Sequence, residues 1–451
     1  MMAESYSCFK AYDIRGRVPS ELNEDIAYRI GRAFAQYLDA GRIVVGHDIR
    51  LTSPSLCDAV VEGIRDAGCD VVHIGECGTE EIYFATFDGG YDGGLVVTAS
   101  HNPMDFNGMK FVREGSRPIS GDDGLPEIKA LAEQGEFSAA PRRGELSHSA
   151  DKQAYIAHLL SYIDIDSLSP LKIVVNAGNG GAGSVVDLLE PHLPFEFIKV
   201  HHQPDGHFPN GIPNPLLEEN RAATADVVKR EKADLGIAWD GDFDRCFFFD
   251  SRGNFVEGYY LVGLLSSAFL KKNGGGKVIH DPRLTWNTIE LAEQCGGQAI
   301  QSKTGHSFIK QVMRDENALY GGEMSAHHYF RDFAYCDSGM IPWLLVAELV
   351  GTSGSSLLEL MADSQARYPV SGEINREVDD AAAMLARIEQ HYAASAELLD
   401  KTDGVSMDFG DWRFNVRMSN TEPLVRLNVE SRGDEALMQA KTAELLAFLD
   451  A

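Results

Sequence analysis

The feature that most constrains the fold is a repeated alternation of short apolar runs with segments of helical periodicity. Runs of β-branched residues at 42–48, 70–75 and 94–100 each end in small or polar residues and precede such a segment. This alternation is typical of parallel strands joined by crossover helices. The pattern returns over 171–242 and again over 277–323, which predicts three successive α/β regions of similar size.

The C-terminal part of the chain departs from this pattern. Residues 411–419 and 425–431 favour two antiparallel strands, flanked by helices that begin near Asp379 and Asp434. We therefore predict an α/β protein in which three similar α/β domains with mixed sheets precede a smaller α+β domain, around a central cleft. The expected domains are 1–150, 151–252, 253–365 and 366–451.

The acidic charge balance narrows the partners that we expect. Lys and Arg together number 40 and Asp and Glu 68, which gives a net charge of −28. Such a chain repels nucleic-acid backbones and anionic membrane surfaces, so neither is an expected partner. Apolar stretches such as 342–350 are far shorter than the roughly 20 residues that cross a bilayer, and residues 1–13 hold no apolar signal core. The expected location is the cytoplasm.

Ligands of open α/β sheets bind beyond the carboxyl ends of strands, so the residues that follow each predicted strand are the candidate ligand contacts. After residues 94–99 comes Ser100-His101-Asn102-Pro103, where the Asn-Pro step disfavours helix and places the serine on a stiff loop. The hydroxyl is a candidate nucleophile or phosphate carrier. A polar loop without a chemical role is the competing interpretation.

A second strand is followed by three carboxylates at alternate positions, Asp240, Asp242 and Asp244. Such a cluster repels itself unless a hard cation neutralises it, and oxygen ligands suit Mg²⁺. The alternative is a solvated acidic loop. The apolar flanks at 236–239 and 246–249 disfavour full solvation, so the sequence favours a metal site.

Three further loops carry groups suited to a sugar phosphate. Residues 303–310 place lysine and histidine around a glycine turn, which suits phosphate binding or proton transfer. Residues 321–328 offer a carboxylate, a hydroxyl and imidazoles that can bind sugar hydroxyls. Residues 417–423 combine an arginine with small donors, as a phosphate cradle would. For each loop, a structural role alone is the alternative.

Taken together, these loops resemble those of the α-D-phosphohexomutase superfamily. Its four loop signatures are matched by TASHNP at 98–103, DGDFDR at 240–245, GEMSAHHYF at 322–330 and RMSNTEP at 417–423. Its N-terminal motif is matched by FKAYDIRG at 9–16. The resemblance spans the whole chain, and within the superfamily the sequence is most similar to bacterial phosphomannomutases.

The resemblance implies an isomerase that converts mannose 6-phosphate reversibly to mannose 1-phosphate, through a phosphoserine enzyme and a hexose 1,6-bisphosphate intermediate. It implies Mg²⁺ as cofactor, hexose 1,6-bisphosphate as activator, hexose monophosphates as substrates, and a monomer or homodimer. Ala326 stands where many members with both mannose and glucose activity have glycine, so a phosphoglucomutase or a dual-specificity enzyme is the main alternative. A sugar-phosphate phosphatase, which would carry the phosphoryl group on an aspartate, and a non-catalytic sugar-phosphate binding protein are the others.

The resemblance also implies roles for individual residues. Ser100 would carry the phosphoryl group and would hold Mg²⁺ together with Asp240, Asp242 and Asp244. The candidates for proton transfer and charge stabilisation are Arg15, Lys110, His306 and His327. The candidates for substrate binding are Tyr12, Arg245, Arg283, Glu323, Ser325, Arg417, Ser419, Asn420 and Thr421.

Overall fold

The computed structural model describes residues 6–418 and 424–450. The chain divides into two compact units. Unit 1 comprises Met1–Phe255 and Asp332–Gly354, and unit 2 comprises Val256–Arg331 and Ser355–Ala451. The four domain boundaries expected from the sequence stay a prediction.

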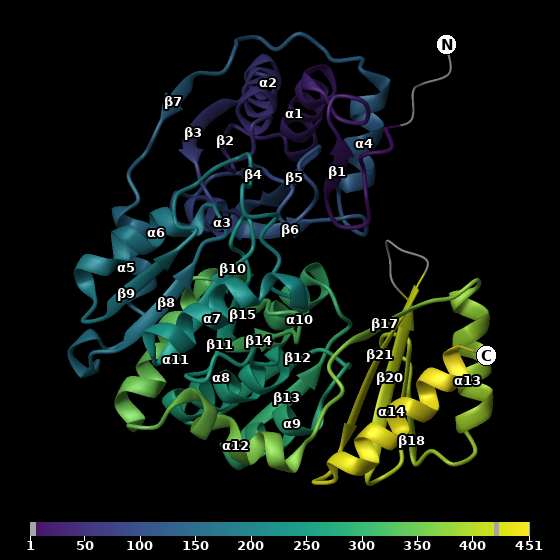
Figure 1. Ribbon diagram of the computed structural model, residues 1–451. Helices are drawn as coiled ribbons and strands as arrows, with labels where there is room; N and C mark the ends of the chain where they lie inside the picture. The colour runs from purple at the N-terminus through teal and green to yellow at the C-terminus, as the bar shows by residue number, and fades with distance from the viewer. Residues whose placement is uncertain (1–5, 419–423, 451) are drawn as a thin grey trace. The chain divides into compact units, whose positions relative to one another are not determined.

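The first sheet of unit 1 alternates strands and helices as predicted. Its elements are β1 (Ile14–Arg17), α1 (Glu24–Leu38), β2 (Arg42–His47), α2 (Ser53–Asp66), β3 (Asp70–Glu76), α3 (Thr79–Asp88), β4 (Gly93–Val97), β5 (Phe106–Arg113), β6 (Arg117–Ile119), α4 (Leu125–Gln134) and β7 (Leu146–His148). The strand order is β1-β5-β4-β2-β3-β7, with β6 paired to β5. The sheet is mixed, because β2 runs parallel to β3 and β4 whereas β5 runs antiparallel to β1 and β4. Figure 1 shows α1 and α2 on one face and α3 on the other.

A second, smaller sheet completes unit 1. Its elements are α5 (Gln153–Leu160), β8 (Lys172–Asn176), α6 (Ala182–Leu189), β9 (Glu196–Val200), α7 (Ala222–Glu231), β10 (Leu235–Trp239) and β11 (Cys246–Phe249). The segment Asp332–Gly354 of unit 1 contains β16 (Cys336–Asp337) and α11 (Ile341–Ser353). The strand order is β11-β10-β8-β9. Because β11 folds back antiparallel on β10, the acidic residues between them lie at the carboxyl end of β10.

Unit 2 begins with a third sheet of the same kind. Its elements are α8 (Gly258–Asn273), β12 (Gly276–His280), α9 (Trp286–Gln294), β13 (Gly297–Gln301), α10 (His306–Glu316), β14 (Tyr320–Gly322), β15 (His328–Phe330) and α12 (Leu357–Arg367). The interior strand β12 runs parallel to both β13 and β14, and β15 runs antiparallel to β14. The strand ends at His280, Gln301 and Gly322 therefore lie along one edge of the sheet.

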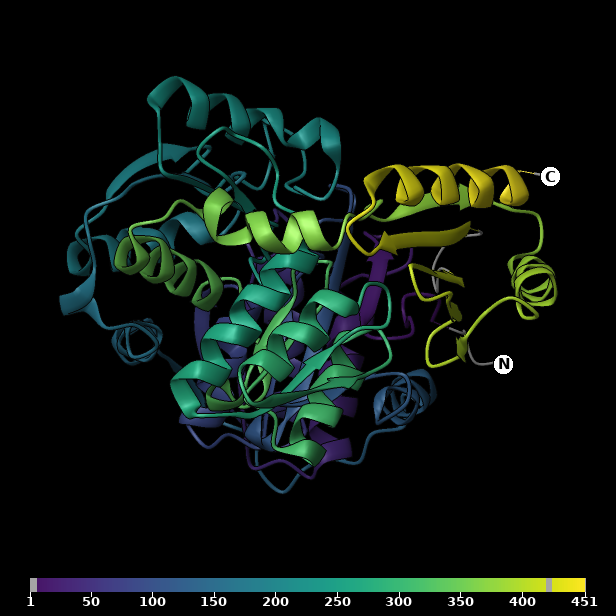
Figure 2. The same ribbon diagram turned by 90° about the horizontal axis from the view of Figure 1, so that it is seen from below.

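The C-terminal part of unit 2 is the predicted α+β region. Its elements are β17 (Ile374–Glu377), α13 (Ala381–Tyr392), β18 (Leu398–Asp400), β19 (Val405–Asp408), β20 (Trp412–Met418), β21 (Leu424–Ser431) and α14 (Glu435–Leu449). These form an antiparallel sheet in the order β17-β21-β20-β19-β18. Figure 2 shows α14 lying along this sheet, and apolar residues of α13 and α14 share one core with β19, β20 and β21.

Capping residues explain where the two C-terminal helices begin. The Asp380 carboxylate accepts from the Ala383 N–H, and the Asp434 carboxylate accepts from the Leu437 N–H. Each cap satisfies an N–H group that the first helical turn cannot pair itself. Among the described helices, none alone is long and apolar enough to cross a membrane, and only α11 and α12 taken as a pair meet that test.

Candidate active site

Ser100 lies in the loop that follows β4, where the sequence places a stiff turn. The side chain is buried, and Oγ donates to Oδ2 of Asp240 at 2.8 Å. A Cβ at Gly241 would lie 2.5 Å from the carbonyl oxygen of Ser100, so only glycine lets the two loops approach this closely. The serine and the acidic loop are thus brought together from positions 140 residues apart.

The three aspartates between β10 and β11 form a buried cluster. Asp240 and Asp242 are 0% exposed and Asp244 is 3% exposed, so the interpretation as a solvated acidic loop is wrong. Each residue offers a carboxylate oxygen, and these oxygens lie within 4.8 Å of one another. Burial raises the pKa of Asp240 to about 6, although the charge of Arg245 opposes this effect.

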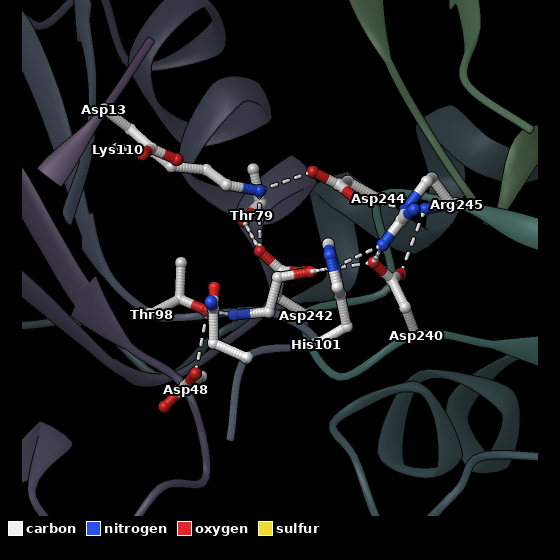
Figure 3. A network of polar contacts seen from close by, with 12 residues as sticks. Asp13, Asp48, Thr79, Thr98, His101, Lys110, Asp240, Asp242, Asp244 and Arg245 are labelled. Carbon is white, nitrogen blue, oxygen red and sulfur yellow. Dashed lines mark hydrogen bonds and ion pairs between the residues drawn. The ribbon is translucent and has the colours of Figure 1, made fainter. Parts of the chain in front are cut away.

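Two cations balance this cluster, as Figure 3 shows. The Lys110 ammonium donates to Asp242 at 2.7 Å and to Asp244 at 2.5 Å, and the Arg245 guanidinium donates to Asp240 at 2.6 and 2.9 Å. Burial alone would lower the pKa of Lys110, but the two carboxylates hold it above its ordinary value. Lys110 is therefore an ion-pair partner of both carboxylates.

The cluster also fits a divalent metal ion. Among the described residues, the Oδ1 atoms of Asp242 and Asp244 are buried and have no hydrogen-bond partner. Buried carboxylate oxygens without donors are costly unless a cation meets them. Oxygen-only ligands of this kind suit a hard cation such as Mg²⁺.

Arg15 and Tyr12 come from the N-terminal segment. Arg15 lies in β1, where its guanidinium pairs with Asp13 and donates to the side-chain oxygen of Asn102 at 2.8 Å. This contact places Arg15 beside the loop that carries Ser100. Tyr12 precedes β1 and is half-buried.

The predicted sugar loop lies in unit 2, between β14 and β15. The Glu323 carboxylate accepts from the Gly305 N–H at 3.0 Å and from the Tyr329 hydroxyl at 2.5 Å. Arg283, which follows β12, donates to the Ser325 hydroxyl at 3.3 Å and lies 3.7 Å from Glu323. Three of the predicted substrate-binding residues therefore meet in one cluster.

The two candidate histidines of unit 2 flank this cluster in sequence. His306 is the first residue of α10, directly after Gly305. His327 precedes β15, and its ring stacks near that of Tyr329, with centroids 6.1 Å apart. Both rings are partly exposed.

The predicted phosphate cradle is described only in part. Arg417 lies in β20 and donates to the Glu373 carboxylate at 3.1 Å. Arg283 and Arg426 also pair with Glu373, so one carboxylate meets three guanidinium groups. Ser419, Asn420 and Thr421 lie outside the described residues.

Sequence reasoning missed several groups that contact the predicted residues. Thr79, the first residue of α3, donates its hydroxyl to Asp242 at 2.5 Å. Nδ1 of His101 accepts from Arg245 at 2.6 Å and lies 3.1 Å from Ser100 Oγ. Its adjacency to Ser100 was the available signal for His101, whereas nothing local marks Thr79, which lies 163 residues from its partner.

Comparison with known proteins covers nearly the whole chain. Four family models match, described as phosphoglucomutase/phosphomannomutase α/β/α domains I, II and III and C-terminal domain, at residues 7–139, 153–253, 257–368 and 373–447. A curated relative from Xanthomonas campestris pv. campestris, named for phosphohexose mutases, is 63% identical over 98% of each chain. An Escherichia coli relative named phosphomannomutase is 61% identical over 98% of this chain and 99% of its own. A crystal structure of a phosphoglucomutase/phosphomannomutase family protein from Burkholderia thailandensis superposes with a TM-score of 0.89 at 31% identity, covering 99% of this chain and 97% of that chain.

Proposed function

This chain belongs to the phosphoglucomutase/phosphomannomutase family, and we propose that it is the member that interconverts mannose 6-phosphate and mannose 1-phosphate. Family membership makes it a phosphohexomutase. The substrate preference rests on relatives named phosphomannomutase that are 55–61% identical over nearly the full chain. A phosphoglucomutase or dual-specificity activity is the alternative.

One observation carries the proposed chemistry: the Ser100 hydroxyl donates to a buried carboxylate of the aspartate cluster. Phosphoryl transfer requires charge neutralisation and alignment more than covalent assistance. Lys110 and Arg245 supply fixed positive charge within the same buried network, which favours a dianionic phosphoryl group at Ser100.

The proposed reaction consists of two phosphoryl transfers. In the first, the bond between phosphorus and Ser100 Oγ breaks as a sugar hydroxyl oxygen bonds to phosphorus, and the hydroxyl proton passes to a base. The product is a hexose 1,6-bisphosphate. In the second, Ser100 Oγ bonds to the phosphorus at the other end of the sugar, the bond from that phosphorus to the sugar oxygen breaks, and the sugar oxygen takes up the proton from the base. Arg15, Lys110, His306 and His327 are the candidates for this proton transfer and for charge stabilisation.

Asp240, Asp242 and Asp244, together with the phosphorylated Ser100, would hold Mg²⁺. When bound, the ion neutralises phosphoryl oxygens and aligns them for in-line transfer. Hexose 1,6-bisphosphate would serve as activator, because it can restore the phosphoryl group to an enzyme that has lost it.

Unit 2 would recognise the sugar phosphate. Glu323 and Ser325 offer an acceptor and a hydroxyl to sugar hydroxyl groups, and Arg283 fixes both within one cluster. Arg417 would bind the phosphate that is not reacting, with Ser419, Asn420 and Thr421 completing the cradle. An arginine fork suits both orientations of the sugar, because it recognises phosphate oxygens common to the two ends.

A coupled assay on mannose 1-phosphate and glucose 1-phosphate, with catalytic bisphosphate present, tests this proposal. Ser100→Ala should abolish most turnover, while Ser149→Ala, an exposed serine, should not. Intact-protein mass should show one phosphoryl group on the wild type and none on Ser100→Ala. Acid-labile phosphate on an aspartate would contradict the mechanism, and a higher catalytic efficiency with glucose 1-phosphate would contradict the preference.

A further inference from the structure

The same tetrapeptide pattern occurs at the end of an interior strand in two different sheets. His47-Asp48-Ile49-Arg50 begins at the end of β2, and His280-Asp281-Pro282-Arg283 begins at the end of β12. Each of these strands runs parallel to both of its neighbours. One neighbour of each leads into a functional loop, since β4 precedes Ser100 and β14 precedes Glu323.

The two turns have the same internal geometry. Nδ1 of His47 lies 2.8 Å from the Asp48 carbonyl oxygen, and Nδ1 of His280 lies 2.8 Å from that of Asp281. In each turn, the first carboxylate oxygen of the aspartate accepts from the backbone N–H of the arginine at 2.9 Å. The turns are thus one structural motif used twice.

In each copy the second carboxylate oxygen reaches the adjacent functional loop. Asp48 Oδ2 accepts from the Thr98 hydroxyl at 2.7 Å, and Thr98 Oγ1 in turn accepts from the Ser100 N–H at 3.0 Å, as Figure 3 shows in part. Asp281 Oδ2 accepts from the Met324 N–H at 2.9 Å. The aspartate therefore connects the end of its own strand to the loop that follows the neighbouring strand.

Arg50 extends this connection along the whole phosphoserine loop. Its side chain is 2% exposed. Its two terminal nitrogens donate to four backbone carbonyl oxygens, those of Ser100, Asn102, Pro103 and Phe106, at 2.9, 2.5, 2.8 and 3.1 Å. A lysine cannot reproduce this pattern, because only the planar guanidinium fork offers several donors in fixed directions.

The loop needs such support because Ser100 has φ of +48°, the left-handed region that a residue with a side chain rarely adopts. A conformation of this kind persists only where the surroundings impose it. Neither Asp48 nor Arg50 contacts the Ser100 hydroxyl; both contact its backbone or a residue that does.

We propose that Asp48, Arg50 and Thr98 are positioning residues that hold Ser100 in the orientation from which the phosphoryl group is transferred. Asp281 holds the sugar-recognition loop in the same way. This inference rests on the proposed role of Ser100 as phosphoryl carrier. It assigns the two copies of one motif to different parts of the reaction, the first to transfer and the second to substrate binding.

The sharpest test is the pair Thr98→Val and Thr98→Ser. Valine has the shape of threonine but leaves Asp48 Oδ2 and the Ser100 N–H without their shared partner, whereas serine keeps the hydroxyl. In a single turnover with mannose 1,6-bisphosphate, Thr98→Val should slow phosphorylation of Ser100 by roughly 10- to 100-fold, and Thr98→Ser should recover most of that loss. A rate constant is the chosen measure because it does not depend on the fraction of enzyme that is folded.

Two further variants test the two copies of the turn separately: Arg50→Lys alters the first copy, and Asp281→Asn alters the second. Arg50→Lys should lower kcat by a similar factor with KM for mannose 1-phosphate nearly unchanged. Asp281→Asn should raise that KM, and at saturating mannose 1,6-bisphosphate it should slow phosphorylation of Ser100 less than Thr98→Val does. Phosphorylation rates within 2- to 3-fold of wild type for both Thr98→Val and Arg50→Lys would overturn the inference, as would equal losses with Thr98→Ser and Thr98→Val. Ser100→Ala with undiminished turnover would instead overturn the proposed function itself.

Discussion

Glu430→Gln should destabilise the attachment of the C-terminal sheet within unit 2. Glu430 lies in β21 and is 0% exposed. Its carboxylate accepts from Arg413 at 2.7 Å, from the Tyr259 hydroxyl at 2.5 Å and from the Thr285 N–H at 2.8 Å. Through this one side chain, β21 is joined to α8 and to the segment between β12 and α9.

The expected loss of stability follows from the unpaired charge that the substitution leaves buried. Glutamine retains an acceptor of the same shape but carries no charge, so the Arg413 guanidinium, 5% exposed, stays buried without a counter-ion. Removing one partner of a buried ion pair costs about 3–5 kcal/mol. Arg413 also donates to the carbonyl oxygens of Pro282 and Arg283, so the turn that presents Arg283 should loosen as well.

Hydrogen exchange read by peptide mass gives the opening free energy of β20 and β21 directly. A factor of ten in exchange rate corresponds to about 1.4 kcal/mol of opening free energy. The expected loss of stability should therefore accelerate hydrogen exchange in those peptides by roughly 100-fold or more. Glu293→Gln removes an exposed carboxylate from α9 and should change stability by no more than about 0.5 kcal/mol.

The double variant Arg413→Met/Glu430→Gln distinguishes the cost of an unpaired buried charge from the cost of the other lost contacts. It should be less destabilised than the sum of the two single variants, because no unpaired charge is left buried. Acceleration below about tenfold for Glu430→Gln, or strict additivity in the double variant, would refute the argument from the buried charge.

Three further outcomes are expected. Asp242→Asn should weaken Mg²⁺ binding in calorimetry by roughly 10-fold or more with the fold intact by circular dichroism, and full activity after thorough chelation of the wild type would contradict the metal assignment. Arg417→Ala should raise KM for both monophosphates, by an amount that corresponds to about 1.5–3 kcal/mol of lost binding free energy. A rise in KM for only one of the two monophosphates would argue against a shared phosphate cradle. Burial lowers the pKa of His328 to about 3 from an ordinary value of 6.5, so the folded state disfavours a proton that the unfolded state accepts. The contribution of His328 to the free energy of unfolding is therefore fully present above pH 6.5 and falls by about 1.4 kcal/mol per pH unit toward pH 3. In His328→Gln, the urea midpoint of unfolding should depend less steeply on pH over this range.

The strands that carry the fold could be predicted because their apolar runs are local signals. Residues 42–48, 277–281 and 425–431 overlap β2, β12 and β21, and the antiparallel pairing of the last with β20 is confirmed. Because ligands bind beyond the carboxyl ends of strands in such sheets, Ser100 and the three aspartates could also be predicted as site residues. The structure brings Ser100 and Asp240 into contact. The roles assigned to these residues stay predictions.

The supporting contacts could not be predicted because they depend on which strands are neighbours. Asp48 reaches Thr98 only because β2 lies beside β4, and Arg50 reaches Phe106 only because β5 follows in the same sheet. The sequence shows polar residues after β2, yet an isolated Asp-x-Arg also suits an ordinary turn. The contacts of Thr79 and Glu373 are long-range in the same sense.

The duplicated His-Asp-x-Arg turn suggests how such a chain diversifies over evolutionary time. Two segments that share a buried turn but differ in the loops above it are what copying of one ancestral segment would leave. The turn resists mutation because its aspartate and arginine are buried and hydrogen-bonded, whereas the loop it supports is free to acquire new chemistry. One copy lies beside a loop that presents a serine and the other beside a loop that presents a carboxylate. Exchange of loops between the two turns therefore offers a route to ancestral-like variants in which the support is kept and only the reacting group changes.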